Sequence, residues 1–252
     1  MSDIILSAEG LSKQFSGFVA VNNVSLSVRR GTIHALIGPN GAGKTTYFNM
    51  LSKFLEPSAG RIVYNGQDIT RMKPANVARL GLVRSFQISA VFGNMTALEN
   101  VRVALQRKLG TTFHFWRSQS SLSSLNEEAM HHLQTVGLAD AHATHAAMLP
   151  YGHKRALELA TTLALNPEMM LLDEPTAGLT HGDIDRITDL IRDAARSRTV
   201  LLVEHNLSVV ADLSDTITVL TRGEILAEGP YAEVSQDPRV MEAYLGTPSD
   251  AA

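Results

Sequence analysis

The chain has 252 residues, 44% of them hydrophobic, which is enough for one large α/β domain or for a core with a smaller subdomain. Its formal net charge of −3 gives no basic field for nucleic acid, and the absence of cysteine excludes disulfides, thiolate metal sites and cysteine catalysis. The N-terminus lacks a signal-peptide pattern, and no window approaches the ~18 apolar residues of a membrane-spanning helix. Any link to a membrane is therefore expected to run through a partner.

The N-terminal part of the chain carries short β-type segments. Alternating apolar and polar residues within 3–36 predict a hairpin-rich antiparallel sheet. Residues 32–37 predict a buried strand that ends at a Gly-Pro-Asn-Gly turn, and a helix is expected from about Gly43 to Lys53. A further strand bounded by turns is expected at 60–66.

The strand signals vanish between residues 88 and 165. Helical segments are expected near 96–108, 126–137 and 151–165. The segment 110–124 is rich in Ser and Thr and carries a few aromatic residues, which indicates an insertion or a loop. We therefore expect a helical subdomain set into an α/β core.

An α/β alternation returns after residue 166 and predicts a mainly parallel sheet. Expected here are buried strands at 169–172 and 199–203, helices at 181–196 and 206–213, a hairpin at 216–229 and a short helix at 238–245. No internal repeat is visible, so residues 1–252 are expected to form a single domain. Its expected parts are a core of 1–87 and 166–230, a helical subdomain of 88–165, and a C-terminal helix and tail of 231–252.

A phosphate-binding loop is the most specific motif of the chain. Residues 38–45 match the pattern G-x-x-x-x-G-K-[ST], with an apolar strand before them and a helix after them. Glycines let successive backbone N–H groups point inward, and the N-terminus of the helix adds its positive end. A nucleotide triphosphate, ATP, is the expected ligand. The residues expected to bind it are Gly38, Pro39, Asn40, Gly41, Ala42, Gly43, Lys44, Thr45 and Thr46.

Within this loop, Lys44 is expected to reach the β- and γ-phosphates, and the Thr45 hydroxyl to ligate Mg²⁺. A dinucleotide-binding fingerprint is excluded because Thr46 stands where a third glycine is required, and no acidic residue follows about 20 positions later.

Two carboxylates, Asp173 and Glu174, follow the buried strand at 169–172. The carboxyl ends of parallel strands carry the ligand site in α/β sheets. Asp173 is expected to hold Mg²⁺, directly or through water, and Glu174 to orient or deprotonate the attacking water. His205 follows another buried strand and is expected to contact a γ-phosphate, and Gln87 is expected to ligate Mg²⁺.

The order of these motifs over residues 4–246 resembles the nucleotide-binding domain of ABC transporters, a P-loop NTPase (RecA-like) fold. The resemblance implies that Asp173 is the Walker B aspartate, Glu174 the catalytic glutamate, Gln87 the Q-loop residue and His205 the switch histidine. It also places Phe15 where the family stacks an aromatic ring on adenine.

The same resemblance places residues 149–153 at the signature motif, with Tyr151, Gly152 and His153 expected to bind nucleotide. In this family two subunits pack head to tail, so that the signature helix of one points its N-terminus at the ATP held by the other. The implied partners are transmembrane permease subunits and a second ATP-binding subunit, either identical or a sister chain. The implied place is the cytoplasmic face of the inner membrane.

Within the family, the chain is more similar to the ATP-binding subunits of branched-chain amino acid importers. Three features support this: Tyr151 in the signature, an extended segment at about 102–125, and the C-terminal sequence Met-Glu-Ala-Tyr-Leu-Gly at 241–246. A periplasmic substrate-binding protein is then implied as an indirect partner.

The chain also departs from the family pattern at three positions. Pro150 replaces the signature serine, His153 replaces the signature glutamine, and Thr180 stands where aspartate is common. Lys44, Asp173, Glu174 and His205 are intact, so active hydrolysis is expected.

Two alternatives to amino acid import stay open at this point. One is the same ATPase driving export of lipid or lipopolysaccharide, which uses a single domain of similar size. The other is a non-transport ATPase acting on ribosomes or DNA, which the acidic balance and the single copy of the domain disfavour.

Overall fold

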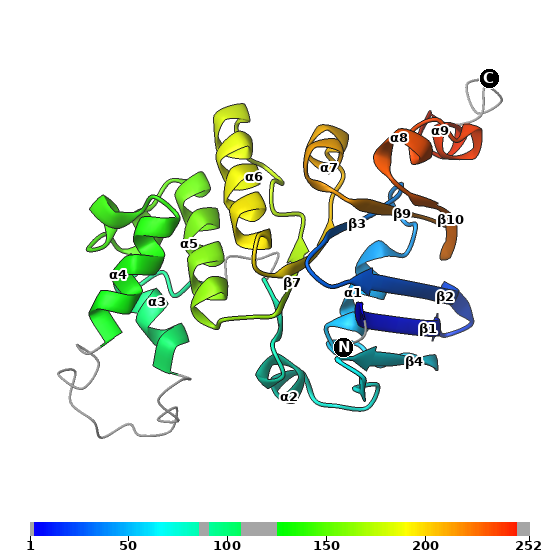
Figure 1. Ribbon diagram of the computed structural model, residues 1–252, viewed down its shortest axis with the longest axis horizontal. Coiled ribbons are helices and arrows are strands. Elements are labelled where there is room, and N and C mark those ends of the chain that lie inside the picture. Colours follow the sequence, from blue (N-terminus) through cyan, green and yellow to red (C-terminus); the bar gives the residue numbers. More distant parts are fainter. Residues whose placement is uncertain (1–2, 86–90, 107–124, 246–252) are drawn as a thin grey trace. The chain divides into compact units, whose positions relative to one another are not determined.

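The computed structural model describes residues 3–85, 91–106 and 125–245. The chain divides into two compact units (Figure 1). The sheet unit comprises Met1–Leu82, Glu168–Glu174 and Ala195–Ala252. The helical unit comprises Val83–Pro167 and Pro175–Ala194. Gln87 and the segment 110–124 lie outside the described residues.

A four-stranded antiparallel sheet forms the N-terminal part of the sheet unit. Its strand order is β2 (Phe18–Arg29), β1 (Ile4–Phe15), β4 (Ala59–Tyr64) and β5 (Gln67–Asp68). The C-terminal half of β2 alternates buried and exposed residues, because one face packs on the core and the other faces solvent. This sheet confirms the antiparallel N-terminal region predicted from the alternating pattern.

A six-stranded, mostly parallel sheet carries the other predicted strands. Its order is β10 (Glu224–Gly229), β9 (Thr216–Thr221), β3 (Ile33–Ile37), β8 (Thr199–Val203), β7 (Met169–Asp173) and β6 (Leu82–Arg84). Strand β3 runs parallel to both β8 and β9, and β7 runs parallel to β8. Every residue of β3, β7 and β8 is buried, which explains why these strands read as continuous apolar runs.

The helices of the sheet unit are α1 (Lys44–Leu51), α2 (Pro74–Arg79), α7 (Leu207–Leu213), α8 (Tyr231–Val234) and α9 (Pro238–Leu245). Helix α1 buries Tyr47, Phe48, Met50 and Leu51 in a core cluster that also takes residues from both sheets. The loop between β3 and α1 is therefore anchored at both ends in the core.

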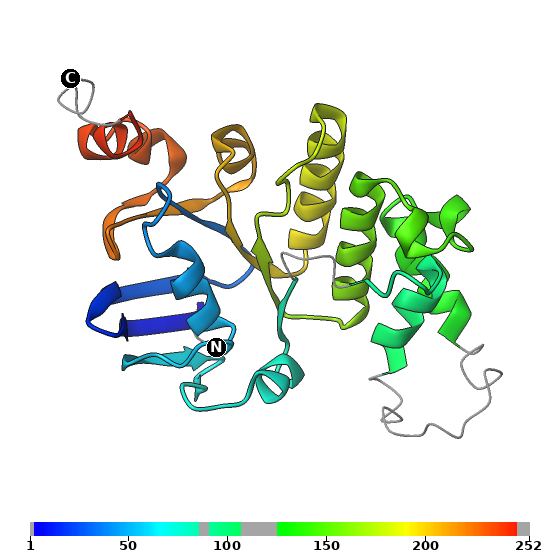
Figure 2. The same cartoon turned by 180° about the vertical axis from the view of Figure 1, so that it is seen from behind.

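The helical unit contains α3 (Ala97–Leu105), α4 (Asn126–Thr135), α5 (Tyr151–Ala164) and α6 (His181–Ala195), with short 3₁₀ turns η3 (Ala139–Ala141) and η4 (Ala146–Met148). Helices α3, α4 and α5 contact one another, and Figure 2 shows them side by side from the opposite direction. Helix α6 groups with them, although its sequence continues the α/β alternation.

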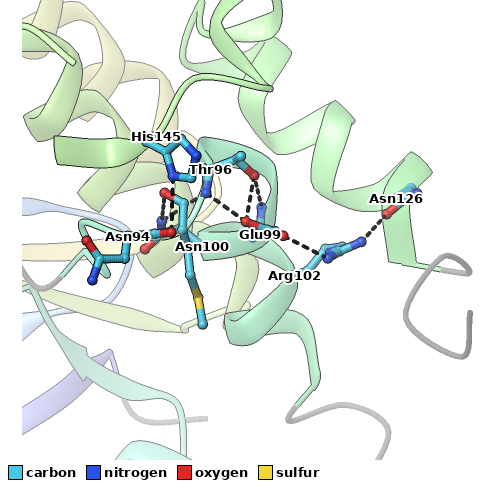
Figure 3. A network of polar contacts seen from close by, with 8 residues as sticks. Asn94, Thr96, Glu99, Asn100, Arg102, Asn126 and His145 are labelled. Carbon is cyan, nitrogen blue, oxygen red and sulfur yellow. Dashed lines mark hydrogen bonds and ion pairs between the residues drawn. The ribbon is translucent and has the colours of Figure 1, made fainter. Parts of the chain in front are cut away.

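A polar network fixes the start of α3 within the helical unit (Figure 3). Thr96 and Glu99 form a reciprocal capping box, in which the Thr96 N–H donates to Glu99 Oε2 at 2.8 Å and the Glu99 N–H donates to Thr96 Oγ1 at 3.2 Å. Arg102 then donates to Asn126 Oδ1 at 3.1 Å and so links α3 to α4. Among the described residues, no helix has the length and apolar character needed to cross a bilayer.

Candidate functional site

The phosphate loop at 38–43 leaves β3 and enters α1, as predicted. Gly38 has a φ of 149°, and a Cβ there would lie 2.1 Å from the Leu220 carbonyl oxygen. Gly43 has a φ of 100°, and a Cβ there would lie 2.6 Å from the Ala20 carbonyl oxygen. Both positions therefore exclude side chains on grounds of conformation and of space.

A series of main-chain hydrogen bonds links the loop to both sheets. The N–H of Gly223, in the turn between β9 and β10, donates to the Ala42 carbonyl at 2.9 Å. The N–H of Asn22 on β2 donates in turn to the Gly223 carbonyl at 2.8 Å. Backbone groups connected to both sheets thus help to fix the loop.

The N-terminus of α1 is open to an anion. Helix α1 has no acidic residue in its first turn, and no side chain caps it. The buried Lys44 Nζ donates to the carbonyl oxygens of Gly38 and Pro39, at 2.7 and 3.0 Å. Burial lowers the pKa of this amine, and the nearby charge of Glu174 opposes that shift. Thr45 is exposed and Thr46 half-buried in the same first turn.

The two acids lie at the carboxyl end of β7, and Glu174 lies near His205. Asp173 is buried, and Glu174 adopts a φ of 47° while its N–H donates to the Val203 carbonyl at 2.9 Å. His205 Nδ1 lies 4.0 Å from Glu174 Oε1. Because the charge of Glu174 also acts on the Lys44 amine, Lys44, Glu174 and His205 form one electrostatically coupled group of the sheet unit.

Glu204 is a buried residue beside the candidate site that sequence reasoning did not single out. Its side chain is fully buried, and its Oε2 accepts hydrogen bonds from the N–H groups of His205 at 2.9 Å and Asn206 at 3.2 Å. Asn206 in turn caps α7 by accepting from the N–H of Ser208 at 3.1 Å. Glu204 therefore fixes the turn that presents His205. The available signal was an acid placed between a buried strand and a helix N-cap.

Phe15 lies at the end of β1, paired with Phe18 across the hairpin turn. It is 44% exposed, so it is not a core residue, and Lys13 Nζ lies 5.2 Å from its ring centroid. An exposed aromatic face is what adenine stacking requires. Gln87 lies outside the described residues, so its expected contact with Mg²⁺ stays a prediction.

The signature segment belongs to the helical unit, where it forms the N-terminus of α5. Pro150 is the N-cap residue, Tyr151 is exposed, Gly152 is buried and His153 is half-buried. A Cβ on Gly152 would lie 2.4 Å from Oδ1 of Asp183 on α6, so glycine permits this close approach. Thr180, one of the departures from the family pattern, donates its hydroxyl to the same Asp183 carboxylate at 2.8 Å.

The residues of the sheet unit fit a magnesium nucleotide. A Cβ at Gly38 or Gly43 would collide with neighbouring backbone, so glycine at these positions keeps the loop geometry open to phosphate. The N-terminal N–H groups of α1 have no side-chain cap and can bind an anion. Thr45 and Asp173 supply hydroxyl and carboxylate oxygens, the ligand type that Mg²⁺ prefers. No group of three or more His, Asp or Glu suited to a metal occurs in the described part of the chain.

Comparison with known families agrees with this geometry. Residues 21–177 match the family model described as ABC transporter, and residues 224–250 match the model described as branched-chain amino acid ATP-binding cassette transporter.

Two curated relatives and one solved structure are similar over nearly the whole chain. The high-affinity branched-chain amino acid transport ATP-binding protein BraF of Pseudomonas aeruginosa is 40% identical, covering 98% of this chain and 99% of its own. LivG of Escherichia coli, which carries the same description, is 38% identical with the same coverage. The ADP conformation of MJ1267, an ATP-binding cassette of an ABC transporter, superposes with a TM-score of 0.86 at 32% identity, covering 98% of this chain and 100% of that chain.

Proposed function

This chain belongs to the ABC transporter family of ATP-binding subunits, which are ATPases coupled to transport, and we propose that it energises the uptake of branched-chain amino acids with Mg²⁺ as its metal. One observation carries the choice of substrate. Similarity to BraF and LivG extends over 98% of the chain and includes a separate match of the C-terminal residues 224–250. Neither the lipid-export nor the non-transport alternative has comparable support.

The catalytic roles follow from the cluster in the sheet unit. The loop amides and Lys44 bind the phosphates, and Lys44 is well suited to this because its ammonium already lies within the loop. Glu174 orients the attacking water and accepts its proton, while His205 contacts the γ-phosphate and is held in place by Glu204. Mg²⁺, when bound, neutralises charge on the phosphates, and Thr45, Asp173 and Gln87 are its proposed protein ligands.

A second ATP-binding subunit completes each nucleotide site in this proposal, whether it is another copy of this chain or a sister chain. The N-terminus of α5 carries no acidic residue in its own first turn and no side-chain cap, so its helix dipole favours a phosphate, although the Asp183 carboxylate of α6 lies beside Gly152. Pro150 supplies no hydroxyl there, so this contact relies on the helix N-terminus, Tyr151, Gly152 and His153.

Permease subunits at the cytoplasmic face of the inner membrane are the proposed membrane partners, with a periplasmic substrate-binding protein acting through them. The helical unit contains a cavity of about 190 Å³ lined partly by Phe92, Val103 and Ala104. Phe92 is 54% exposed. Its N–H donates to Asn100 Oδ1 at 2.7 Å, and Asn100 Nδ2 donates to the Phe92 carbonyl at 3.1 Å. An exposed aromatic residue on a fixed backbone beside an apolar cavity suits a protein contact.

Uptake of radiolabelled leucine, isoleucine and valine tests the proposal. A strain that lacks this chain but keeps its permease is complemented with the wild-type chain or with Glu174→Gln. Wild type should restore uptake. Glu174→Gln should bind ATP normally but lower both hydrolysis and uptake by about 10²–10⁴-fold, because the general base is lost.

A strain that takes up these amino acids equally well without the chain would refute the proposed substrate. Loss of lipid or lipopolysaccharide export in that strain would favour the exporter alternative. Normal ATP turnover by the purified Glu174→Gln variant would remove Glu174 from the mechanism.

A further inference from the structure

A row of three side chains runs along one face of α5, from its first turn into the interior of the helical unit. Tyr151, Arg155 and Glu158 stand at i, i+4 and i+7, so they share that face. Arg155 is 8% exposed and Glu158 is 6% exposed. Charged residues are buried this deeply only when they are paired, so the row needs a physical explanation.

Arg155 binds the other two side chains directly and so links them. Arg155 Nη1 lies 3.0 Å from Glu158 Oε2, and Arg155 Nη2 donates to the Tyr151 hydroxyl at 2.9 Å. The guanidinium carbon of Arg155 also lies 5.3 Å from the centroid of the Tyr151 ring. Burial opposes the charge on Arg155, but Glu158 and Tyr151 outweigh it and raise the pKa of this residue. The row is thus held together by charge-assisted bonds.

The outer end of the row contacts the loop 175–180, which directly follows Glu174 in the chain. The Tyr151 hydroxyl donates to the Ala177 carbonyl at 3.3 Å. The Tyr151 ring packs against Gly178, where a Cβ would lie 3.4 Å from Cε1. Because the hydroxyl accepts from Arg155 and donates to Ala177, the orientation of Arg155 affects where the loop lies.

The inner end of the row faces the cavity of about 190 Å³ in the same unit. Glu158 lines this cavity together with Phe92, Asn100 and Val103. A segment that entered the cavity would contact Glu158 or displace it, and Arg155 would respond because the two groups are 3.0 Å apart.

We propose that Tyr151, Arg155 and Glu158 are positioning residues that hold the loop 175–180 against the start of α5 and make its position depend on what occupies the cavity lined by Glu158. None of the three has to touch the reacting atoms for this. The occupant is a segment of the permease, so the inference rests on the proposed function. The row makes ATP hydrolysis rise when the permease is bound.

The test compares ATP hydrolysis by the purified chain with hydrolysis by the assembled transporter in lipid vesicles. The readout is the stimulation ratio, kcat in the assembly divided by kcat of the isolated chain. Tyr151→Phe keeps the ring but removes both hydrogen bonds of the hydroxyl, and it should lower the ratio about 3- to 10-fold. The matched control is Tyr231→Phe on α8, which removes a hydroxyl from the sheet unit and should leave the ratio unchanged.

A double variant, Arg155→Met with Glu158→Met, separates positioning from folding. Apolar residues of similar volume preserve stability when they replace a buried ion pair, so the thermal unfolding midpoint should stay near that of wild type. The stimulation ratio should fall as it does for Tyr151→Phe.

Two outcomes would overturn the inference in different ways. A double variant or a Tyr151→Phe variant that folds and keeps the wild-type ratio would show that the row serves packing alone. A wild-type chain that binds no permease, or that the permease does not stimulate, would overturn the proposed function and the inference with it.

Discussion

Two helix N-termini in this protein are proposed to bind phosphate, and they are held in different ways. Neither α1 nor α5 has a side-chain cap or an acidic residue in its first turn. The approach to α1 is fixed by backbone groups, through Gly38, Gly43 and the hydrogen bond from Gly223 to Ala42. The start of α5 is fixed by side chains, chiefly Tyr151 and Arg155.

This difference explains which sequence changes each region tolerates. A backbone cradle requires glycine at fixed positions, and the phosphate loop retains every residue of its pattern. A start fixed by side chains can keep its geometry when individual residues change, provided that the new residues make new contacts. The start of α5 carries Pro150, and the hydroxyl of Thr180 binds Asp183 beside it.

The largest effect is expected for Gly43→Ala, which adds one methyl group to the backbone cradle. A φ of 100° strains any residue other than glycine, and the new Cβ would lie 2.6 Å from the Ala20 carbonyl oxygen. Strain and overpacking together should weaken ATP binding by about 3–5 kcal/mol. Isothermal titration with ATP measures this change. Binding within threefold of wild type would contradict a loop fixed by its backbone.

The next effect concerns acid stability, which should reside in the sheet unit. His34 on β3, the strand that leads into the phosphate loop, is buried, and its Nε2 lies 2.8 Å from Thr218 Oγ1. Burial lowers its pKa from 6.5 to about 4. Between these two values the unfolded chain binds the extra proton, so the free energy of unfolding should fall as the pH drops from 6.5 to 4, by about 3 kcal/mol in total.

Urea unfolding at several pH values measures that slope. The control is His34→Gln, which retains a polar group for Thr218 but has no proton to bind. Between pH 6.5 and 4, its free energy of unfolding should fall by about 3 kcal/mol less than that of the wild type. If the slopes of wild type and variant are equal, the acid sensitivity of the protein arises elsewhere.

A smaller effect is expected for Gly152→Ala at the start of α5. The new Cβ would meet the Asp183 carboxylate at 2.4 Å, but that carboxylate lies at the end of a side chain and is able to shift. We expect the helical unit to lose about 1–3 kcal/mol of stability. Gly182→Ala on α6 is the matched control, since a Cβ there meets nothing within 4 Å, and it should gain about 0.5–1 kcal/mol. Thermal unfolding distinguishes the expected loss of stability in Gly152→Ala from the expected gain in Gly182→Ala. Equal losses in the two variants would mean that the contact with Asp183 does not cause the destabilisation.

The sequence predicted the parts of this protein that depend on local pattern. The two sheets, the phosphate loop and the acids after β7 follow from periodicity, from glycine spacing and from the rule that ligands meet the carboxyl ends of parallel strands. The roles of Lys44, Glu174 and His205 in hydrolysis stay predictions, although the structure brings the three side chains together.

The parts that sequence did not predict depend on which side chains meet across the fold. From the sequence, Glu204 is simply an acidic residue that follows a strand. Only the structure shows that its carboxylate accepts hydrogen bonds from the N–H groups of His205 and Asn206. Arg155 and Glu158 read as exposed residues of a helix, because charge normally faces solvent. Helix α6 reads as a covering helix of the α/β sheet, and only its contacts place it in the helical unit.

The left-handed backbone of Glu174 has a further consequence for engineering. A φ of 47° is unfavourable for a glutamate and easy for a glycine or an asparagine, so this residue keeps a local strain that its neighbours must overcome. Selection for thermal stability alone would favour replacing this residue, whose carboxylate is the proposed general base. A screen for variants of higher thermal stability should therefore keep glutamate at position 174, because variants that lose it are expected to be stable but unable to hydrolyse ATP.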